Sequence, residues 1–199
     1  ALAPLARQLA AARRDWQGWR ILHPSGALDS SVLAPLQRRG AAAGSLHPMM
    51  TFPPPSRRAP ASKGIVFSYE GDAAARRAAA GLIRRWRGLP LPLAPGLKTA
   101  YHLAATLVGP GAVVEMAAAE TVLRRAGLRG PQLARARQGL RQVLAATATN
   151  LQQGLPAAWT GPWARGDRQT ITRHRRQLPS PALRRLSPAL LGTARADPE

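Results

Sequence analysis

The chain is 199 residues long and 45% hydrophobic, which is enough to bury a core in one large domain or two small ones. It contains no cysteine, and this excludes disulfides, thiolate catalysis and thiolate metal sites. Its 29 basic residues against nine acidic residues give a formal net charge of +20. Only Lys63 and Lys98 are lysines, so the positive charge comes almost entirely from arginine.

The arginine excess has two interpretations. A surplus of this size attracts phosphate backbones and predicts salt-sensitive binding to nucleic acid or to an acidic partner. Alternatively, it reflects GC-rich coding sequence, because Ala, Arg, Gly and Pro dominate the chain. The arginines occur as scattered pairs, such as Arg13-Arg14 and Arg84-Arg85, and not as one stripe interleaved with aromatic residues. This distribution favours the compositional interpretation, so nucleic acid is not the expected main partner, although the charge does not exclude it.

Hydrophobic periodicity and turn residues predict an α/β segment followed by an all-α segment. In residues 1–94 we expect alternating helices and strands, with helices over about 4–16, 31–39 and 72–86, strands over 19–23, 41–46 and 64–69, and an edge strand over 89–93. Helical crossovers of this length connect parallel strands, so we predict the second half of a parallel Rossmann-type sheet. In residues 95–199 we expect helices only, over about 97–128 with a break at Gly109-Pro110-Gly111, then 132–153 and 167–177, with an irregular tail from about 178.

Nothing at the sequence level indicates a membrane span or a secretion signal. The most apolar stretch, residues 103–123, contains the helix-breaking Gly109-Pro110-Gly111 and carries Glu115 and Glu120. Residues 1–14 lack the apolar core of a signal peptide, so we expect a cytoplasmic protein. The chain does not begin with Met, which led us to expect an N-terminal truncation.

Two similar triplets end two predicted strands: Leu22-His23-Pro24 and Leu46-His47-Pro48. Ligands of open α/β sheets bind in the crevice at the carboxyl edge of the strands. We therefore expect both histidines, together with Ser25 and Thr51, to face one crevice. The alternative is that a His-Pro pair merely stops each strand, and the sequence leaves the two interpretations level.

The chain lacks the patterns of several other sites. It has no GxGxxG turn after a strand, so a phosphate-binding site is not complete within it. It has no HExxH, no GxSxG and no cluster of carboxylates, and its four histidines lack metal-ligand spacing, so we expect no metal.

Lys98 and His102 stand one helical turn apart at the start of the long predicted helix. A partly buried lysine can act as a general acid or base, which arginine cannot do. The alternative is a solvated first-turn lysine beside a packed histidine, and the pair by itself favours that alternative.

The motifs occur in a series that resembles one family. The series runs through His23-Pro24-Ser25-Gly26, Gly44-Ser45-Leu46-His47-Pro48-Met49-Met50-Thr51-Phe52, Tyr69-Glu70-Gly71-Asp72, Tyr101-His102, and Thr160-Gly161-Pro162 followed by Arg165-Gly166-Asp167. It covers about residues 15–175 and resembles Rossmann-like oxidoreductases, described as NADP- or deazaflavin-dependent, whose C-terminal part is a domain of unknown function. These are similar in plan to pyrroline-5-carboxylate reductase, ketopantoate reductase and β-hydroxyacid dehydrogenases.

The resemblance implies a nucleotide domain that begins roughly 80 residues before Ala1. It also implies a helical domain, like the C-terminal domain of 6-phosphogluconate dehydrogenase, that pairs two subunits and completes the active site. The implied cofactor is NADP, or NAD or a deazaflavin, and the implied substrate is a small molecule. The resemblance implies that Ser25 contacts the substrate and that Lys98 is catalytic, with His102 at a position where β-hydroxyacid dehydrogenases have Asn. Together with the strand-end residues, we therefore predict Lys98 and His102 for catalysis, Ser25, Gly26, His47 and Thr51 for substrate, and His23 and Pro48 for cofactor.

The sequence departs from the family pattern at two places. Met50 stands where the family has Gln, and Gly109-Pro110 stands where it usually has Ser-Asn. Both changes remove polar groups from the predicted crevice, which indicates a different substrate or an inactive paralogue. The preferred hypothesis is an NAD(P)-dependent oxidoreductase fragment, and the alternative is a non-enzymatic basic interaction module.

Overall fold

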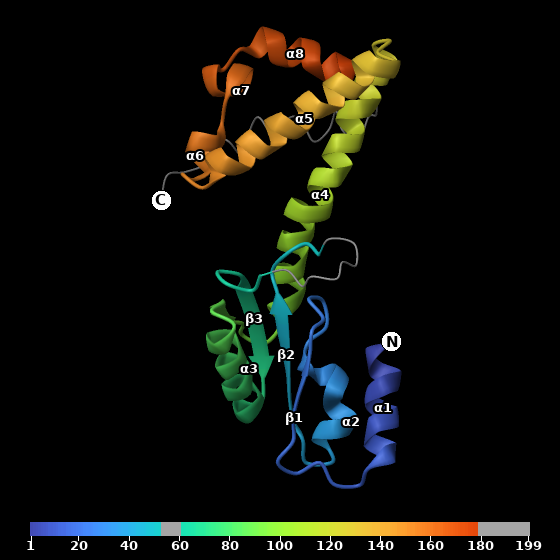
Figure 1. Ribbon diagram of the computed structural model, residues 1–199, viewed down its shortest axis with the longest axis vertical. Helices are drawn as coiled ribbons and strands as arrows, with labels where there is room; N and C mark the ends of the chain where they lie inside the picture. Colours follow the sequence, from blue (N-terminus) through green and yellow to red (C-terminus); the bar gives the residue numbers. More distant parts are fainter. Residues whose placement is uncertain (53–60, 179–199) are drawn as a thin grey trace. The chain divides into compact units, whose positions relative to one another are not determined.

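The computed structural model describes residues 1–52 and 61–178 (Figure 1). The chain divides into two compact units, Ala1–Gly111 and Ala112–Glu199, which are described here one at a time. The predicted tail from about residue 178 lies almost entirely outside the described residues.

The first unit is built on a four-stranded sheet in the order β1-β2-β3-β4. Its strands are β1 (Arg20–His23), β2 (Ala42–Pro48), β3 (Val66–Gly71) and β4 (Leu89–Pro92). β4 lies at the edge, as predicted, where prolines at two of its four positions cost no ladder hydrogen bonds.

The sheet is mixed, and the prediction of an all-parallel sheet is wrong at one pair. β1 runs parallel to β2 and β3 runs parallel to β4, but β2 and β3 are antiparallel. The parallel pairs are joined through helices: the 3-10 helix η1 (Ser30–Leu33) with α2 (Ala34–Gln37), and α3 (Ala73–Arg85). The described residues between β2 and β3 contain no helix, and antiparallel neighbours need no crossover helix.

Helices cover the two faces of this sheet (Figure 1). α3 packs on one face, where Ala79 and Ile83 meet Leu46 and Phe67 in an apolar cluster. α1 (Leu2–Ala12) and α2 pack on the other face, over a cluster that includes Ala43. The predicted order of an α/β segment followed by helices is confirmed.

Asp72 stands at the N-cap position of α3, but its carboxylate does not cap the helix. Asp72 Oδ2 instead accepts hydrogen bonds from the Ala43 backbone N–H (2.8 Å) and from Gln37 Nε2 (3.0 Å). The start of α3 is thereby tied to β2 and α2.

α4 (Lys98–Arg125) is one continuous helix, so the predicted break at Gly109-Pro110-Gly111 is wrong. Pro110 lacks an N–H, which removes the usual donor to the Thr106 carbonyl, but one lost bond does not end a helix of this length. The two compact units divide at residues 111/112, inside α4, whereas the change from strands to helices falls near the predicted position, 94/95.

The second unit is helical throughout its described part. After the end of α4 it contains α5 (Gly130–Leu151), α6 (Leu155–Ala158), α7 (Gly161–Arg165) and α8 (Arg168–Gln177). Glu120 on α4 pairs with Arg124 at 2.7 Å and with Arg137 on α5. Asp167 caps α8 by accepting the Thr170 N–H at 3.0 Å, as its position predicts.

α4 is long and apolar enough to cross a membrane by length and composition alone. Core helices of soluble proteins pass the same test, so the property is weak evidence on its own. The sequence argued against a membrane span partly because a break was expected at Gly109-Pro110-Gly111. Because α4 is continuous, that argument no longer applies.

Candidate functional site

One face of the sheet is polar toward the carboxyl ends of β1 and β2. Strand pairing places His23 opposite Ser45, Ser45 opposite Glu70, and His47 opposite Ser68. Paired residues and residues two apart along a strand share a face, so these five side chains lie together. The same face continues at Ile21 and Ala43, where it is apolar and covered by α1 and α2. Polar side chains therefore occupy only the part of this face beyond the apolar cluster.

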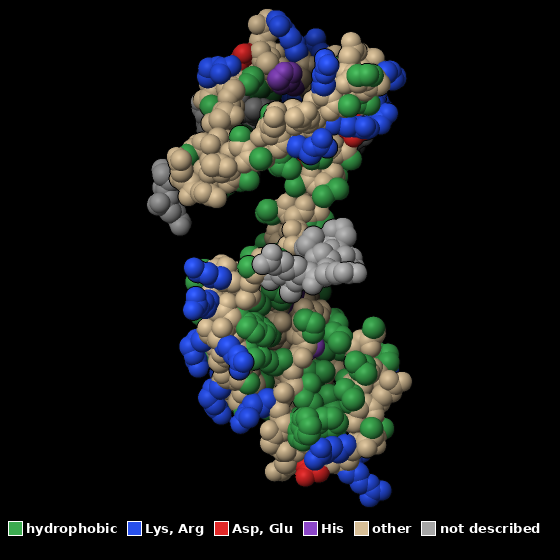
Figure 2. Space-filling model, viewed as in Figure 1, with side chains coloured by type: hydrophobic (Ala, Val, Ile, Leu, Met, Phe, Trp, Pro, Cys, Tyr) green, Lys and Arg blue, Asp and Glu red, His purple; other side chains and the backbone are tan. Residues whose placement is uncertain are grey.

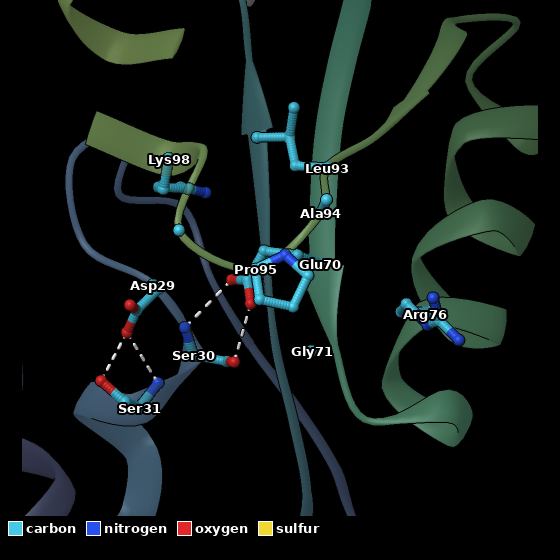
Figure 3. A pocket seen from close by; sticks show the side chains of 11 residues that line it. Asp29, Ser30, Ser31, Glu70, Gly71, Arg76, Leu93, Ala94, Pro95 and Lys98 are labelled. Atoms are coloured by element: carbon cyan, nitrogen blue, oxygen red, sulfur yellow. Dashed lines mark hydrogen bonds between the residues drawn. The ribbon is translucent and has the colours of Figure 1, made fainter. Parts of the chain in front are cut away.

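The start of α4 brings Lys98 onto this polar surface. Lys98 is 3% exposed, and its Nζ donates a hydrogen bond of 2.5 Å to Ser45 Oγ. Ser45 Oγ in turn donates to Glu70 Oε1, also at 2.5 Å. Glu70 accepts two further bonds from Ser30, from its N–H at 3.0 Å and from its hydroxyl at 2.8 Å (Figure 3). The alternative of a solvated first-turn lysine is wrong, because the amine is buried and hydrogen-bonded.

The surroundings of Lys98 act on its charge in opposite directions. Burial lowers the pKa of Lys98, and the nearby carboxylates of Glu70 and Asp29 offset part of that effect. A lysine with a lowered pKa can exchange a proton nearer to neutral pH than an ordinary lysine can. The predicted general acid-base role of Lys98 remains a prediction.

A second cluster joins His47, Tyr101 and His102 around Gly26. His47 Nδ1 lies 3.1 Å from the Tyr101 hydroxyl, and the rings of His47 and His102 are 5.9 Å apart and nearly perpendicular. A Cβ on Gly26 would lie 2.5 Å from His102 Nδ1 and 2.7 Å from His47 Nε2. Only glycine allows both rings to approach this turn so closely.

This cluster is largely shielded from water and contains polar atoms without partners. Burial, followed by the charges of Lys98 and His102, lowers the pKa of His47 to about 4, so the ring is neutral at pH 7. Burial also raises the pKa of Tyr101, while the neighbouring Ser68 hydroxyl lowers it. Among the described residues, His102 Nδ1 and Ser68 Oγ are buried without a hydrogen bond of ordinary geometry. Such atoms cost stability unless a ligand or water satisfies them.

His23 and Ser25 shape the turn after β1. His23 is 3% exposed; its Nδ1 accepts the Ser25 N–H at 3.2 Å, so its Nε2 carries the proton and donates to the Asp29 carbonyl at 3.0 Å. Burial lowers the pKa of His23. Ser25 Oγ accepts the Leu28 N–H at 3.0 Å. Both side chains are thus engaged within the turn, and the predicted cofactor contact of His23 and substrate contact of Ser25 remain predictions.

The two other predicted residues lie near the end of β2. Pro48 is the last residue of β2, paired with Phe67, and is half-buried. Thr51 is exposed, with its methyl group beside Gly109 of α4. Their predicted contacts, to cofactor and substrate respectively, remain predictions.

Sequence reasoning missed Ser45, Glu70 and Tyr101 as members of the site. Each lies inside a motif of the resembling series, and Ser45 and Glu70 are polar residues in strands that also contain apolar residues. That polar interruption was the available signal, but only the strand register shows that the two side chains meet.

A pocket of about 320 Å³ opens beside Lys98 and Glu70 (Figure 3). Its lining combines the charged and hydroxyl side chains of Asp29, Ser30, Ser31, Glu70, Arg76 and Lys98 with residues 93–96, which include Leu93 and Pro95. A pocket of this size, apolar over much of its wall with a few polar groups, fits a small molecule. In the described part of the chain, no three His, Cys, Asp or Glu side chains group as a metal site requires.

Comparison with known proteins matches this chain to one family model and to solved structures. Residues 65–190 match the family described as a domain of unknown function (DUF2520). Protein TM1727 from Thermotoga maritima is similar with a TM-score of 0.69 and 23% identity, over 87% of this chain and 67% of that one. A "putative NADP oxidoreductase", BF3122 from Bacteroides fragilis, is similar with a TM-score of 0.64 and 23% identity, over 88% of this chain and 64% of that one. No curated protein matches the chain.

These likenesses establish the shared fold. The chain spans about two thirds of the length of both solved structures. The family match begins at the start of β3, so it includes Glu70 and Lys98 but not His23 or Ser45.

Proposed function

We propose that this chain, which belongs to the family described as a domain of unknown function (DUF2520), forms much of an NAD(P)-dependent oxidoreductase for a small molecule. One observation carries the proposal: the Lys98 amine is buried and hydrogen-bonded, and Lys98 lines a small pocket together with charged and hydroxyl side chains. The similar fold of BF3122, whose name describes an NADP oxidoreductase, supports it at the level of fold.

In this proposal Lys98 moves the proton that accompanies reduction or oxidation of the substrate. Its Nζ gives a proton to the substrate oxygen or nitrogen in one direction and takes it back in the other. His102 is the second candidate for this role, since its Nδ1 is buried and has no hydrogen-bond partner among the described residues. Ser25, Gly26, Thr51 and neutral His47 are the candidate substrate contacts, although none of them lines the described pocket beside Lys98.

The residues present fit a cofactor only in part. The pocket has room for a nicotinamide ring or a substrate, but the sequence contains no glycine-rich turn before a helix for a pyrophosphate. Residues outside this sequence would therefore hold the phosphates, and His23 and Pro48 are the candidates to contact the rest of the cofactor. When bound, NADP or NAD supplies hydride transfer, and a deazaflavin is the alternative.

We further propose that the protein is a homodimer paired through its helices. α4 exposes large apolar side chains: Leu103, Leu107, Val108, Val113 and Val114 are each 56% to 77% exposed. Leu103 and Leu107 are one turn apart and share a face. Large apolar side chains left exposed on a helix are typical of a protein contact, and a second copy is the proposed occupant.

The direct test is a fluorescence titration of the complete gene product with NADPH. Saturable binding at micromolar concentrations supports the proposal, and no binding up to the millimolar range contradicts it. The 199-residue chain alone should bind far more weakly, because it lacks a phosphate cradle.

An anionic partner is the second candidate function. Arg76, Arg77, Arg84 and Arg85 are exposed on α3, and none of them forms an ion pair with a described residue. Figure 2 shows basic side chains gathered over the region of α3. This candidate predicts binding to random duplex DNA that disappears at about 0.5 M salt, where such contacts are screened.

A further inference from the structure

Lys98, Ser45 and Glu70 form a hydrogen-bonded chain with a fixed direction. Lys98 Nζ can only donate to Ser45 Oγ, and the single hydroxyl proton of Ser45 is then directed to Glu70 Oε1. Lys98 and Ser45 are 3% and 0% exposed, so water cannot readily replace either partner in these hydrogen bonds. Three elements supply the chain: the start of α4, the middle of β2 and the end of β3.

Glu70 is itself held at both oxygens. Ser45 Oγ and the Ser30 N–H donate to Oε1, and the Ser30 hydroxyl donates to Oε2. A carboxylate that accepts three hydrogen bonds at its two oxygens has little freedom to rotate or to move away from these donors. It also lines the same pocket as Lys98, which places its negative charge beside the amine.

We propose that Glu70, acting through the Ser45 hydroxyl, is a positioning residue that fixes the Lys98 amine at the pocket wall and keeps it in its charged form. The importance of this role for turnover rests on the proposed oxidoreductase function, but the arrangement itself does not. The competing explanation is that the chain only anchors α4 to the sheet and leaves the titration of Lys98 unaffected.

Several other groups act on Lys98, and the test must separate them from Glu70. Asp29 adds a negative charge, while His23 and His47 interact with Lys98 from the sheet. Arg76 lines the same pocket. The pKa of Lys98, lowered by burial, is partly restored by Glu70 and then by Asp29, so loss of the Glu70 charge should lower it further.

Lysine NMR tests the inference directly, because the chain contains only two lysines. Protein labelled with ¹³C at lysine Cε should give two signals, and the variant Lys63→Arg identifies the one from Lys98. Lys63 is exposed and serves as the internal reference. The pH titration of both signals is compared between the unmodified chain, Glu70→Gln and the matched control Asp15→Asn, which removes an exposed carboxylate elsewhere in the same unit.

The expected result is that Glu70→Gln moves the Lys98 midpoint to lower pH, while Asp15→Asn and the Lys63 signal do not move. An unchanged Lys98 midpoint in folded Glu70→Gln overturns the inference. If Glu70→Gln does not fold, Ser45→Ala and Ser45→Thr replace it: Ala should lower the midpoint and Thr, which keeps the hydroxyl, should restore it. Equal midpoints in Ala and Thr overturn the inference.

This measurement needs neither cofactor nor substrate. A Glu70-dependent titration, combined with no NADPH binding by the complete gene product, would contradict the oxidoreductase proposal and leave the positioning role standing. NADPH binding by the complete gene product without a Glu70-dependent titration would support the oxidoreductase proposal and overturn the positioning role.

Discussion

The imidazole rings of His47 and His102 lie 5.9 Å apart, nearly perpendicular, and each presents a nitrogen to the backbone of Gly26. His47 comes from the end of β2 and His102 from the second turn of α4. The turn after β1 is therefore packed directly against two side chains that reach it from other elements.

Gly26→Ala should disrupt this contact. Its new Cβ would lie 2.5 Å from His102 Nδ1 and 2.7 Å from His47 Nε2, so at least one ring must move. We expect a loss of roughly 1–3 kcal/mol in the free energy of unfolding, which is usual for overpacking. Urea denaturation measures the loss. Gly81→Ala on α3 is the control, because its Cβ meets only the tip of Arg84 at 3.9 Å and should stabilise the helix by about 0.5–1 kcal/mol. Equal stability of Gly26→Ala and the unmodified chain would contradict the close approach.

The lowered pKa of His47 predicts how stability depends on pH. The folded state takes up this proton near pH 4, whereas the unfolded state takes it up near 6.5. Between these values the unfolded state binds more protons, so the free energy of unfolding should fall as the pH is lowered from about 6.5 toward 4. The pKa of His23 is also lowered and contributes in the same direction.

Urea denaturation at several pH values, with His47→Gln for comparison, tests this expectation. His47→Gln should flatten the profile between pH 6.5 and 4. His174→Gln, a matched change at an exposed residue of α8, should retain the slope. A slope that is the same in all three proteins would show that His47 does not contribute.

Lys98→Met should abolish most turnover by the complete gene product if Lys98 moves the proton. Loss of a general acid or base typically lowers kcat by a factor of about 10²–10⁴. NADPH oxidation in the presence of a carbonyl or imine substrate measures kcat, while NADPH fluorescence checks that binding survives. Lys63→Met is the control, since Lys63 is exposed and distant in sequence. Undiminished kcat in Lys98→Met would remove this residue from the mechanism.

The exposed apolar side chains of α4 predict a dimer that a single introduced charge can dissociate. Leu107 is 67% exposed, and Leu107→Glu should convert a dimer into monomers because it buries an unpaired carboxylate at the contact. Leu155→Glu places the same change on α6, at a residue that is 73% exposed, and should leave the dimer intact. Sedimentation velocity over a range of concentrations distinguishes the species. A monomer at all concentrations, or association with lipid vesicles in place of self-association, would contradict the proposed homodimer.

The sequence by itself determined the elements, because the signals for them are local. Alternation, β-branched residues and turn residues located β1, β2, β3 and the edge strand β4. The 3.6-residue periodicity located the longer helices to within a few residues but missed the short helices α6 and α7. The two His-Pro strand ends were also visible, and the parallel pairing of β1 with β2 places both at the same edge of the sheet.

Tertiary structure alone decided the strand directions and the environment of Lys98. The antiparallel pairing of β3 with β2 depends on the direction in which the chain re-enters the sheet after β2. No local sequence pattern specifies that direction. The bonds that bury and hold Lys98 join residues 53 and 25 positions apart, from Lys98 to Ser45 and from Ser45 to Glu70. Residue type and spacing marked Lys98 as unusual, but a lysine becomes a buried, oriented group only when separate strands and a helix assemble around it.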